Sequence, residues 1–249
     1  MDSTAASLPR ALVADDNPTN RLVAGGLMRK LGYRVDEVED GAQAAELGGS
    51  GVYEVILMDL NMPIVDGFDA MRLIRDQEQW AGHPRSRIFA VTAWVTRESR
   101  QRANECGADR FLPKPLTVDA LREAIEQTAP ALRESGEAHP APGTLEVAHL
   151  ADIGGEELVQ EALTTYLEHS RGLFERFDQV PPEDTREIGE IAHNLKGSSL
   201  AIGASDLARV AADLERRARS GDLEALSELR DELDRIARAV WQAAERRLG

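Results

Sequence analysis

The run Val55-Ile56-Leu57-Met58-Asp59 sets four apolar residues directly before a carboxylate. Because this run is short and partly β-branched, it predicts a buried β-strand over residues 55–58. Runs of the same kind occur on both sides of it, at residues 11–14, 34–38, 88–91 and 110–112. Stretches with helical spacing of apolar residues lie between these runs, such as 20–31, which Gly32 ends, and 68–80. Strands that alternate with helices in this way predict a doubly wound α/β domain, with a five-stranded parallel sheet covered on both faces.

The second half of the chain has a different pattern. Residues 133–145 contain two prolines and two glycines without any periodicity, which predicts a linker. Beyond it, apolar residues recur at helical spacing, and Pro181-Pro182 and Gly221-Asp222 interrupt the helices. Four long helices with short connections predict an antiparallel four-helix bundle. We therefore expect an α/β domain over 8–132, the linker, and an all-α domain over 146–249.

Length and composition agree with two domains in one chain. The 249 residues correspond to about two domains at about 150 residues each. The formal net charge of −15 argues against direct binding to nucleic acid, since a phosphate backbone repels an acidic chain. The single cysteine, Cys106, excludes an internal disulfide and a cysteine-rich zinc site. Neither a signal peptide nor an apolar stretch of ~20 residues is present, so we expect a cytoplasmic protein without membrane contact of its own, free-standing or a piece of a longer protein.

Polar residues follow the predicted strands. In a doubly wound fold the functional site lies at the carboxyl ends of the strands. Asp15-Asp16 ends the first strand, Asp59 the third and Thr92 the fourth, and Lys114 follows the fifth. Three carboxylates in one crevice repel one another unless a cation neutralises them, and oxygen ligands suit Mg2+. Asp59 is then a candidate nucleophile for phosphoryl transfer, with Mg2+, Lys114 and Thr92 stabilising charge on the phosphoryl oxygens.

This part of the chain resembles the response-regulator receiver domains, which have a flavodoxin-like fold. The resemblance covers residues 10–130 and rests on several separated elements in the family's order: Asp15-Asp16, the run from Met58 to Pro63, Asp66-Gly67, Thr92-Ala93, Phe111 and Lys114-Pro115. Alone, an Asp-Asp pair can be a helix cap and a Lys-Pro pair an ordinary turn. Together, at this spacing, they favour a receiver. The opening of residues 15–20 is similar to the receivers of hybrid sensor kinases.

The resemblance assigns roles to these residues. It implies a magnesium site of four residues: Asp15, Asp16, Asp59 and the backbone carbonyl of Asn61. It implies that Asp59 accepts the phosphoryl group, that Thr92 and Lys114 contact it, and that Phe111 changes rotamer on phosphorylation. Two hypotheses concern the borders of the site. We expect Trp94 to restrict water and lengthen the phosphoryl lifetime, and we expect an exposed apolar patch on the 20–31 helix (Leu22, Val23 and Leu27) to dock a phosphotransfer helix.

A second candidate site is the segment Ala192-His193-Asn194-Leu195-Lys196-Gly197-Ser198-Ser199. On a helix, Lys196 and Gly197 share a face with His193. Glycine inside a helix costs about 1 kcal/mol, and here its lack of a side chain leaves room for another protein's acidic pocket to reach the imidazole. Lys196 is suited to steady a phosphoryl group, and a histidine near its ordinary pKa is nucleophilic at pH 7. The segment resembles histidine phosphotransfer domains over residues 146–247, which implies that His193 carries a phosphoryl group.

These features predict a protein of the two-component phosphorelay, which takes phosphate on Asp59 and carries it on His193 between a sensor histidine kinase and a downstream response regulator. The chain has no ATP-binding kinase motif, so we expect no kinase activity of its own, although Asp59 is expected to phosphorylate itself with magnesium. Three alternatives stay open: a binding module switched by phosphorylation, a phosphate sink, and a metal-dependent phosphatase. The last lacks an Asp-x-Asp nucleophile loop.

Overall fold

The computed structural model describes residues 8–93, 97–126 and 145–249, which form two compact units. One unit contains a β-sheet and the other is helical, and each is described by itself. The predicted linker 133–145 lies outside the described residues except for its last residue, and so does Trp94.

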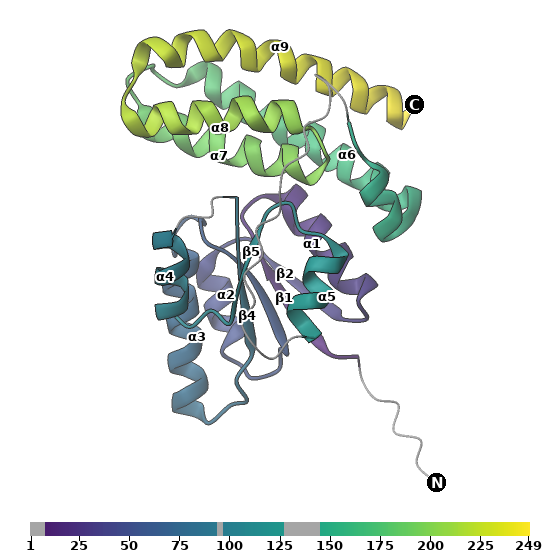
Figure 1. Ribbon diagram of the computed structural model, residues 1–249, viewed down its shortest axis with the longest axis vertical. Coiled ribbons are helices and arrows are strands. Elements are labelled where there is room, and N and C mark those ends of the chain that lie inside the picture. The colour runs from purple at the N-terminus through teal and green to yellow at the C-terminus, as the bar shows by residue number, and fades with distance from the viewer. Residues whose placement is uncertain (1–7, 94–96, 127–144) are drawn as a thin grey trace. The chain divides into compact units, whose positions relative to one another are not determined.

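The sheet of the α/β unit has five parallel strands in the order β2-β1-β3-β4-β5 (Figure 1). Their bounds are β1 Arg10–Ala14, β2 Arg34–Val38, β3 Val55–Asp59, β4 Arg87–Thr92 and β5 Arg110–Pro113. All five predicted strands are confirmed to within one residue at each end. All of β3 is buried, because helices cover both faces of the sheet. Ala14 pairs with Met58 and Asp59 with Val91, so the carboxyl ends of β1, β3 and β4 lie level at one edge.

Five helices connect and follow the strands: α1 Pro18–Lys30, α2 Gly41–Gly48, α3 Gly67–Ala81, α4 Arg97–Glu105 and α5 Val118–Glu126. Figure 1 shows α1 and α5 on one side of the sheet and α2, α3 and α4 on the other. Asp40 and Asp66 cap α2 and α3 by accepting the backbone N–H three residues ahead. The predicted exposed apolar patch on α1 is wrong for two of its three residues, because Val23 and Leu27 are buried. An amphipathic helix turns such apolar side chains away from water, and Leu22 is half-buried.

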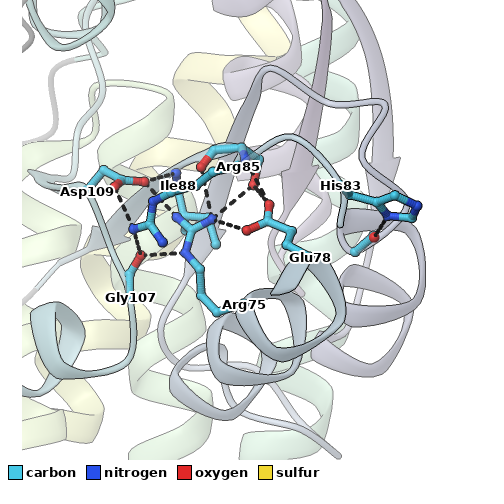
Figure 2. Close-up of polar contacts among 9 residues, drawn as sticks. Arg75, Glu78, His83, Arg85, Ile88, Gly107 and Asp109 are labelled. Carbon is cyan, nitrogen blue, oxygen red and sulfur yellow. Dashed lines mark hydrogen bonds and ion pairs between the residues drawn. The ribbon is translucent and has the colours of Figure 1, made fainter. Parts of the chain in front are cut away.

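Ion pairs occupy the opposite edge of the sheet, at the amino-terminal ends of β4 and β5 (Figure 2). Arg75 of α3 donates to the Gly107 carbonyl at 3.0 Å and pairs with Glu78 and Asp109, each at 2.6 Å. Glu78 is buried and also accepts from the backbone N–H of Ser86 at 2.8 Å. This network ties α3 to the starts of two strands and lies away from the carboxyl edge, so we regard it as structural.

The helical unit is a bundle of four helices: α6 Ala148–Gln179, α7 Thr185–Ala201, α8 Ser205–Ser220 and α9 Leu223–Leu248. Helix α6 contacts α7 and α9, and α8 contacts α7 and α9, as expected of a four-helix bundle (Figure 1). Pro181-Pro182 and Gly221-Asp222 lie between helices, as predicted. A kink at Gly154-Gly155, where Gly155 has φ 71°, was not predicted.

The bundle core draws apolar side chains from all four helices, including Tyr166, Leu195, Leu214 and Val240. Trp241 of α9 donates to the Ser170 hydroxyl of α6 at 2.9 Å, which satisfies a polar group in this core. Among the helices that the structure describes, none combines the length and the apolar character needed to span a membrane.

Candidate functional site

Three carboxylates gather at the carboxyl edge of the sheet. Asp15 and Asp16 directly follow β1 and Asp59 ends β3, and each offers an oxygen within 4.8 Å of those of the other two. Asp59 Oδ1 accepts the backbone N–H of Leu60 at 2.9 Å, which fixes the carboxylate, and Oδ2 faces Lys114. The sequence placed these three residues together correctly. Their negative charge and their hard oxygen donors fit a divalent cation such as Mg2+.

Lys114 brings a positive charge to this acidic cluster. Its Nζ lies 2.7 Å from Asp15 Oδ2 and 3.2 Å from Asp59 Oδ2, and its side chain is 7% exposed. Burial by itself lowers the pKa of Lys114, but the nearby charges of Asp15 and Asp59 outweigh burial and raise the pKa above its ordinary value. Lys114 is therefore a permanent cation at neutral pH, set beside the candidate nucleophile.

The other predicted residues of this site lie on the same edge or next to it. Thr92 is the buried last residue of β4, and its carbonyl accepts the backbone N–H of Lys114 at 2.8 Å. Asn61 has an exposed side chain and lies two residues after Asp59, in the connection from β3 to α3. Phe111 is half-buried in β5 and packs against the core on the side of α2, α3 and α4. The Arg100 guanidinium lies over its ring, 5.6 Å from the centroid.

His193 lies on α7 of the helical unit, and its imidazole contacts a buried acid. Nδ1 lies 3.0 Å from Oε1 of Glu215, a residue of α8 whose side chain is 1% exposed. A carboxylate only accepts hydrogen bonds, so the neutral imidazole donates from Nδ1. The lone pair is then on Nε2, which makes Nε2 the nucleophilic atom.

Two cations also contact Glu215, beside His193. Lys196 Nζ lies 3.4 Å from Glu215 Oε2, and Arg219 donates to Glu215 Oε1 at 2.6 Å. Lys196 thus lies beside His193 as the helical spacing predicted, but its ammonium group is held by the acid and its side chain is 6% exposed. Gly197, the other predicted neighbour, is the next residue of α7. Ile191 and Leu195 on the same helix are buried in the bundle, as expected.

Sequence reasoning missed Glu215 and Arg219. A signal for Glu215 is nevertheless present in α8. The apolar stripe of this helix comprises Leu207, Val210, Ala211, Leu214 and Ala218, and Glu215 falls on that stripe. A carboxylate at a buried position needs a partner of opposite charge or a hydrogen-bond donor, so its position alone pointed to an interaction inside the bundle.

Comparison with protein families identifies both units. The model of the response regulator receiver domain matches residues 11–126. The model of the Hpt domain matches residues 161–239. The two matched segments contain the acidic cluster and His193, respectively.

Two sensor proteins that align with most of this chain are much longer than it. The sensor protein EvgS of Escherichia coli strain K12 is 31% identical over 207 residues, which are 82% of this chain and 16% of that protein. The virulence sensor protein BvgS of Bordetella pertussis is 27% identical over 224 residues, which are 84% of this chain and 18% of that protein. The chain thus spans less than a fifth of the length of these relatives.

Solved receiver structures also align with the first half of the chain. The receiver domain of a sensor histidine kinase from Pseudomonas aeruginosa, solved with a magnesium ion in its active site cleft, is 35% identical and has a TM-score of 0.44. The alignment covers 48% of this chain and 96% of that one. The receiver domain of the histidine kinase CKI1 from Arabidopsis thaliana, solved with Mg2+ and BeF3−, is 32% identical, with a TM-score of 0.44 and coverage of 48% and 91%. On the family matches, this chain joins a response regulator receiver domain to an Hpt domain and belongs with the proteins of two-component phosphorelays.

Proposed function

We propose that the chain carries phosphoryl groups in a two-component phosphorelay, on Asp59 of the receiver domain and on His193 of the Hpt domain. The observation that carries the proposal is that each nucleophile has a charged partner beside it, a lysine at Asp59 and a glutamate at His193. Lys114 lies 3.2 Å from Asp59, and Glu215 lies 3.0 Å from His193. The partners that this function requires are a sensor histidine kinase and a downstream response regulator.

At the receiver site, a carboxylate oxygen of Asp59 attacks the phosphorus of a phosphohistidine. The new P–O bond forms as the P–N bond breaks, and the donor imidazole keeps the electron pair and the proton on its other nitrogen. Lys114 stabilises the negative charge of the phosphoryl oxygens, and Thr92 donates its hydroxyl to one of them. A bound Mg2+ ion, held by Asp15, Asp16, Asp59 and the Asn61 carbonyl, would add further charge neutralisation.

At the Hpt site, Nε2 of His193 attacks the phosphorus of an acyl phosphate, and the P–O bond to the carboxylate breaks. As the ring becomes phosphorylated it gains positive charge, and Glu215 stabilises that charge through Nδ1. No separate base is needed, because the attacking Nε2 carries a lone pair and no proton. The same arrangement supports the reverse transfer, since Glu215 keeps Nδ1 protonated in both directions.

The proposal is tested by transfer between two inactive chains. An H193Q chain is labelled with radioactive acetyl phosphate and Mg2+, freed of donor, and mixed with a D59N chain. We expect hydroxylamine-sensitive label on the H193Q chain, at Asp59, and then acid-labile, alkali-stable label on the D59N chain, at His193. A D76N chain, changed at an exposed acid of α3, serves as the control and should label like the wild type.

Other labelling results would favour one of the alternative functions or contradict the proposal. Label that is lost from Asp59 to water without reaching His193 would favour a phosphate sink. Label that stays on Asp59 for long periods without reaching His193 would favour a binding module switched by phosphorylation. No label at Asp59 in the presence of Mg2+ would contradict the proposed function of the receiver domain.

A further inference from the structure

Helix α4 is attached to the receiver domain by few apolar contacts. Its one buried residue is Ala103, and the rest of its sequence is polar or charged. Two of its arginines instead lie over aromatic rings, Arg100 over Phe111 of β5 and Arg102 over Phe68 of α3. Individual cation–π contacts near a surface are weak, so α4 is held by interactions that are easily broken and remade.

The contact between Arg100 and Phe111 connects α4 to the strand that leads into the phosphorylation site. The guanidinium carbon lies 5.6 Å from the ring centroid, within the range of a cation–π interaction. Arg100 Nε is buried and donates no hydrogen bond to any residue of the described chain. A hydrogen bond from this atom therefore does not hold the guanidinium over the ring. Phe111 lies on β5, three residues before Lys114, which directly follows the strand.

We propose that Arg100 is a positioning residue that holds the Phe111 ring in its resting rotamer and thereby sets how readily the receiver takes up a phosphoryl group. The inference rests on the proposed function and on the rotamer change of Phe111 that the resemblance to receiver domains implies for phosphorylation of Asp59. It adds a residue of α4 to the groups that control the receiver.

The rotamer of Phe111 and the binding of a phosphoryl group at Asp59 are thermodynamically coupled. Phe111 pairs with Ala90 on β4, two residues before Thr92, and the Thr92 carbonyl accepts the backbone N–H of Lys114. A contact that exists in only one rotamer of Phe111 opposes any ligand that favours the other rotamer. Loss of a weak cation–π contact should therefore tighten the binding of a phosphoryl mimic roughly two- to five-fold.

The test uses beryllofluoride with Mg2+ as the phosphoryl mimic and the full chain labelled with 4-fluorophenylalanine. The chain has five phenylalanines, and an F111L variant identifies the fluorine resonance of Phe111. The titration gives the affinity for beryllofluoride, and the resonance reports the surroundings of the ring. The two readouts separate binding at Asp59 from the position of Phe111.

Three variants of α4 make the comparison. Arg100→Met removes the charge and keeps an apolar stem over the ring, and it should tighten binding and shift the unliganded Phe111 resonance toward its position in the beryllofluoride form. Arg100→Lys keeps the charge and should stay close to the wild type. Arg102→Met is the control, since it removes a cation–π contact of the same helix, to Phe68, together with an exposed ion pair to Asp66, and leaves Phe111 untouched.

Two results would overturn the inference. In the first, Arg100→Met matches the wild type in affinity and resonance. In the second, Arg102→Met has the same effect as Arg100→Met, because general loosening of α4 would then explain both. A wild-type chain that binds no beryllofluoride would instead contradict the proposed function, and the inference would fall with it.

Discussion

Glu215 Oε1 lies 3.0 Å from Nδ1 of His193, and the same carboxylate is held by Arg219 and Lys196. The acid is buried between α7 and α8, and two cations fix both of its oxygens. Its position determines which ring nitrogen of His193 carries the proton. In the proposed function, the carboxylate therefore acts on His193 through Nδ1, while the phosphoryl group binds Nε2.

Removal of this acceptor should slow phosphoryl transfer to His193. We expect Glu215→Leu to reduce the rate about ten- to hundred-fold, the effect of losing one hydrogen bond to a charged group, ~1.5–3 kcal/mol. Glu215→Gln should lose less, because its amide oxygen still accepts from Nδ1. The measurement is the rate of label transfer from a phosphorylated H193Q chain to the variant.

The control for this prediction is Asp213→Asn, a change at a more exposed acid of the same helix that pairs with Arg216. Unfolding in urea must accompany the kinetics, since loss of Glu215 leaves the buried Lys196 without its acid. A folded Glu215→Leu chain that accepts label as fast as the wild type would show that Glu215 does not orient His193.

Mg2+ should stabilise the receiver domain through the acidic cluster. At about ten times its Kd, a ligand of the folded state adds ~1.4 kcal/mol, which raises Tm by several degrees for a domain of this size. Asp16→Asn should abolish the shift, and it leaves the pairs of Lys114 with Asp15 and Asp59 in place. Calorimetry with and without Mg2+ measures the shift, and the transition of the helical unit is an internal reference. An equal shift in wild type and Asp16→Asn would exclude Asp16 as a ligand.

The fold was largely predictable because its signals are local. Runs such as 55–58 are apolar over the length of a strand, and β3 extends them only by Asp59. The acidic cluster was predictable as well, since the carboxyl ends of parallel strands meet at one edge whatever the details of packing. Leu27 shows the limit of such reasoning, because helical periodicity does not say which apolar residues of α1 face the sheet.

The missed features are contacts between residues far apart in sequence. Glu215 meets His193 across two helices, 22 positions apart, and no motif joins them. Arg75 meets Asp109 across 34 positions. Such pairs depend on how helices and strands are placed in space, which the sequence pattern of each element does not contain.

The raised pKa of Lys114 has a consequence for alkaline stability. A cation whose pKa is higher in the folded state contributes its full stability below the pKa of the unfolded chain, ~10.4, and loses it as pH rises through the folded value. The difference in free energy of unfolding between wild type and Lys114→Met should therefore be constant from pH 7 to about pH 10 and shrink above it. Urea unfolding at several pH values measures the difference. A decrease already between pH 7 and pH 9 would contradict the assignment.

Tyr166 also has a raised pKa, in this case because of burial, so the bundle should lose stability over the same alkaline range. Tyr166→Phe removes this contribution and leaves that of Lys114, which lies in the other unit. The variant thus separates the two sources of alkaline unfolding.

The Arg75 network should control stability and leave phosphorylation unchanged. Arg75→Met leaves Glu78, whose side chain is 5% exposed, without its positively charged partner, and we expect a loss of about 3 kcal/mol in the free energy of unfolding. Arg85→Met removes another arginine from Asp109, but Arg85 is 59% exposed, so its loss should be below ~1 kcal/mol. Urea unfolding tests both values. Labelling at Asp59 should be the same per folded molecule in both variants, because the network lies at the amino-terminal edge of the sheet. A folded Arg75→Met chain that labels slowly would show that this edge is coupled to the phosphorylation site and would make the network part of the switch.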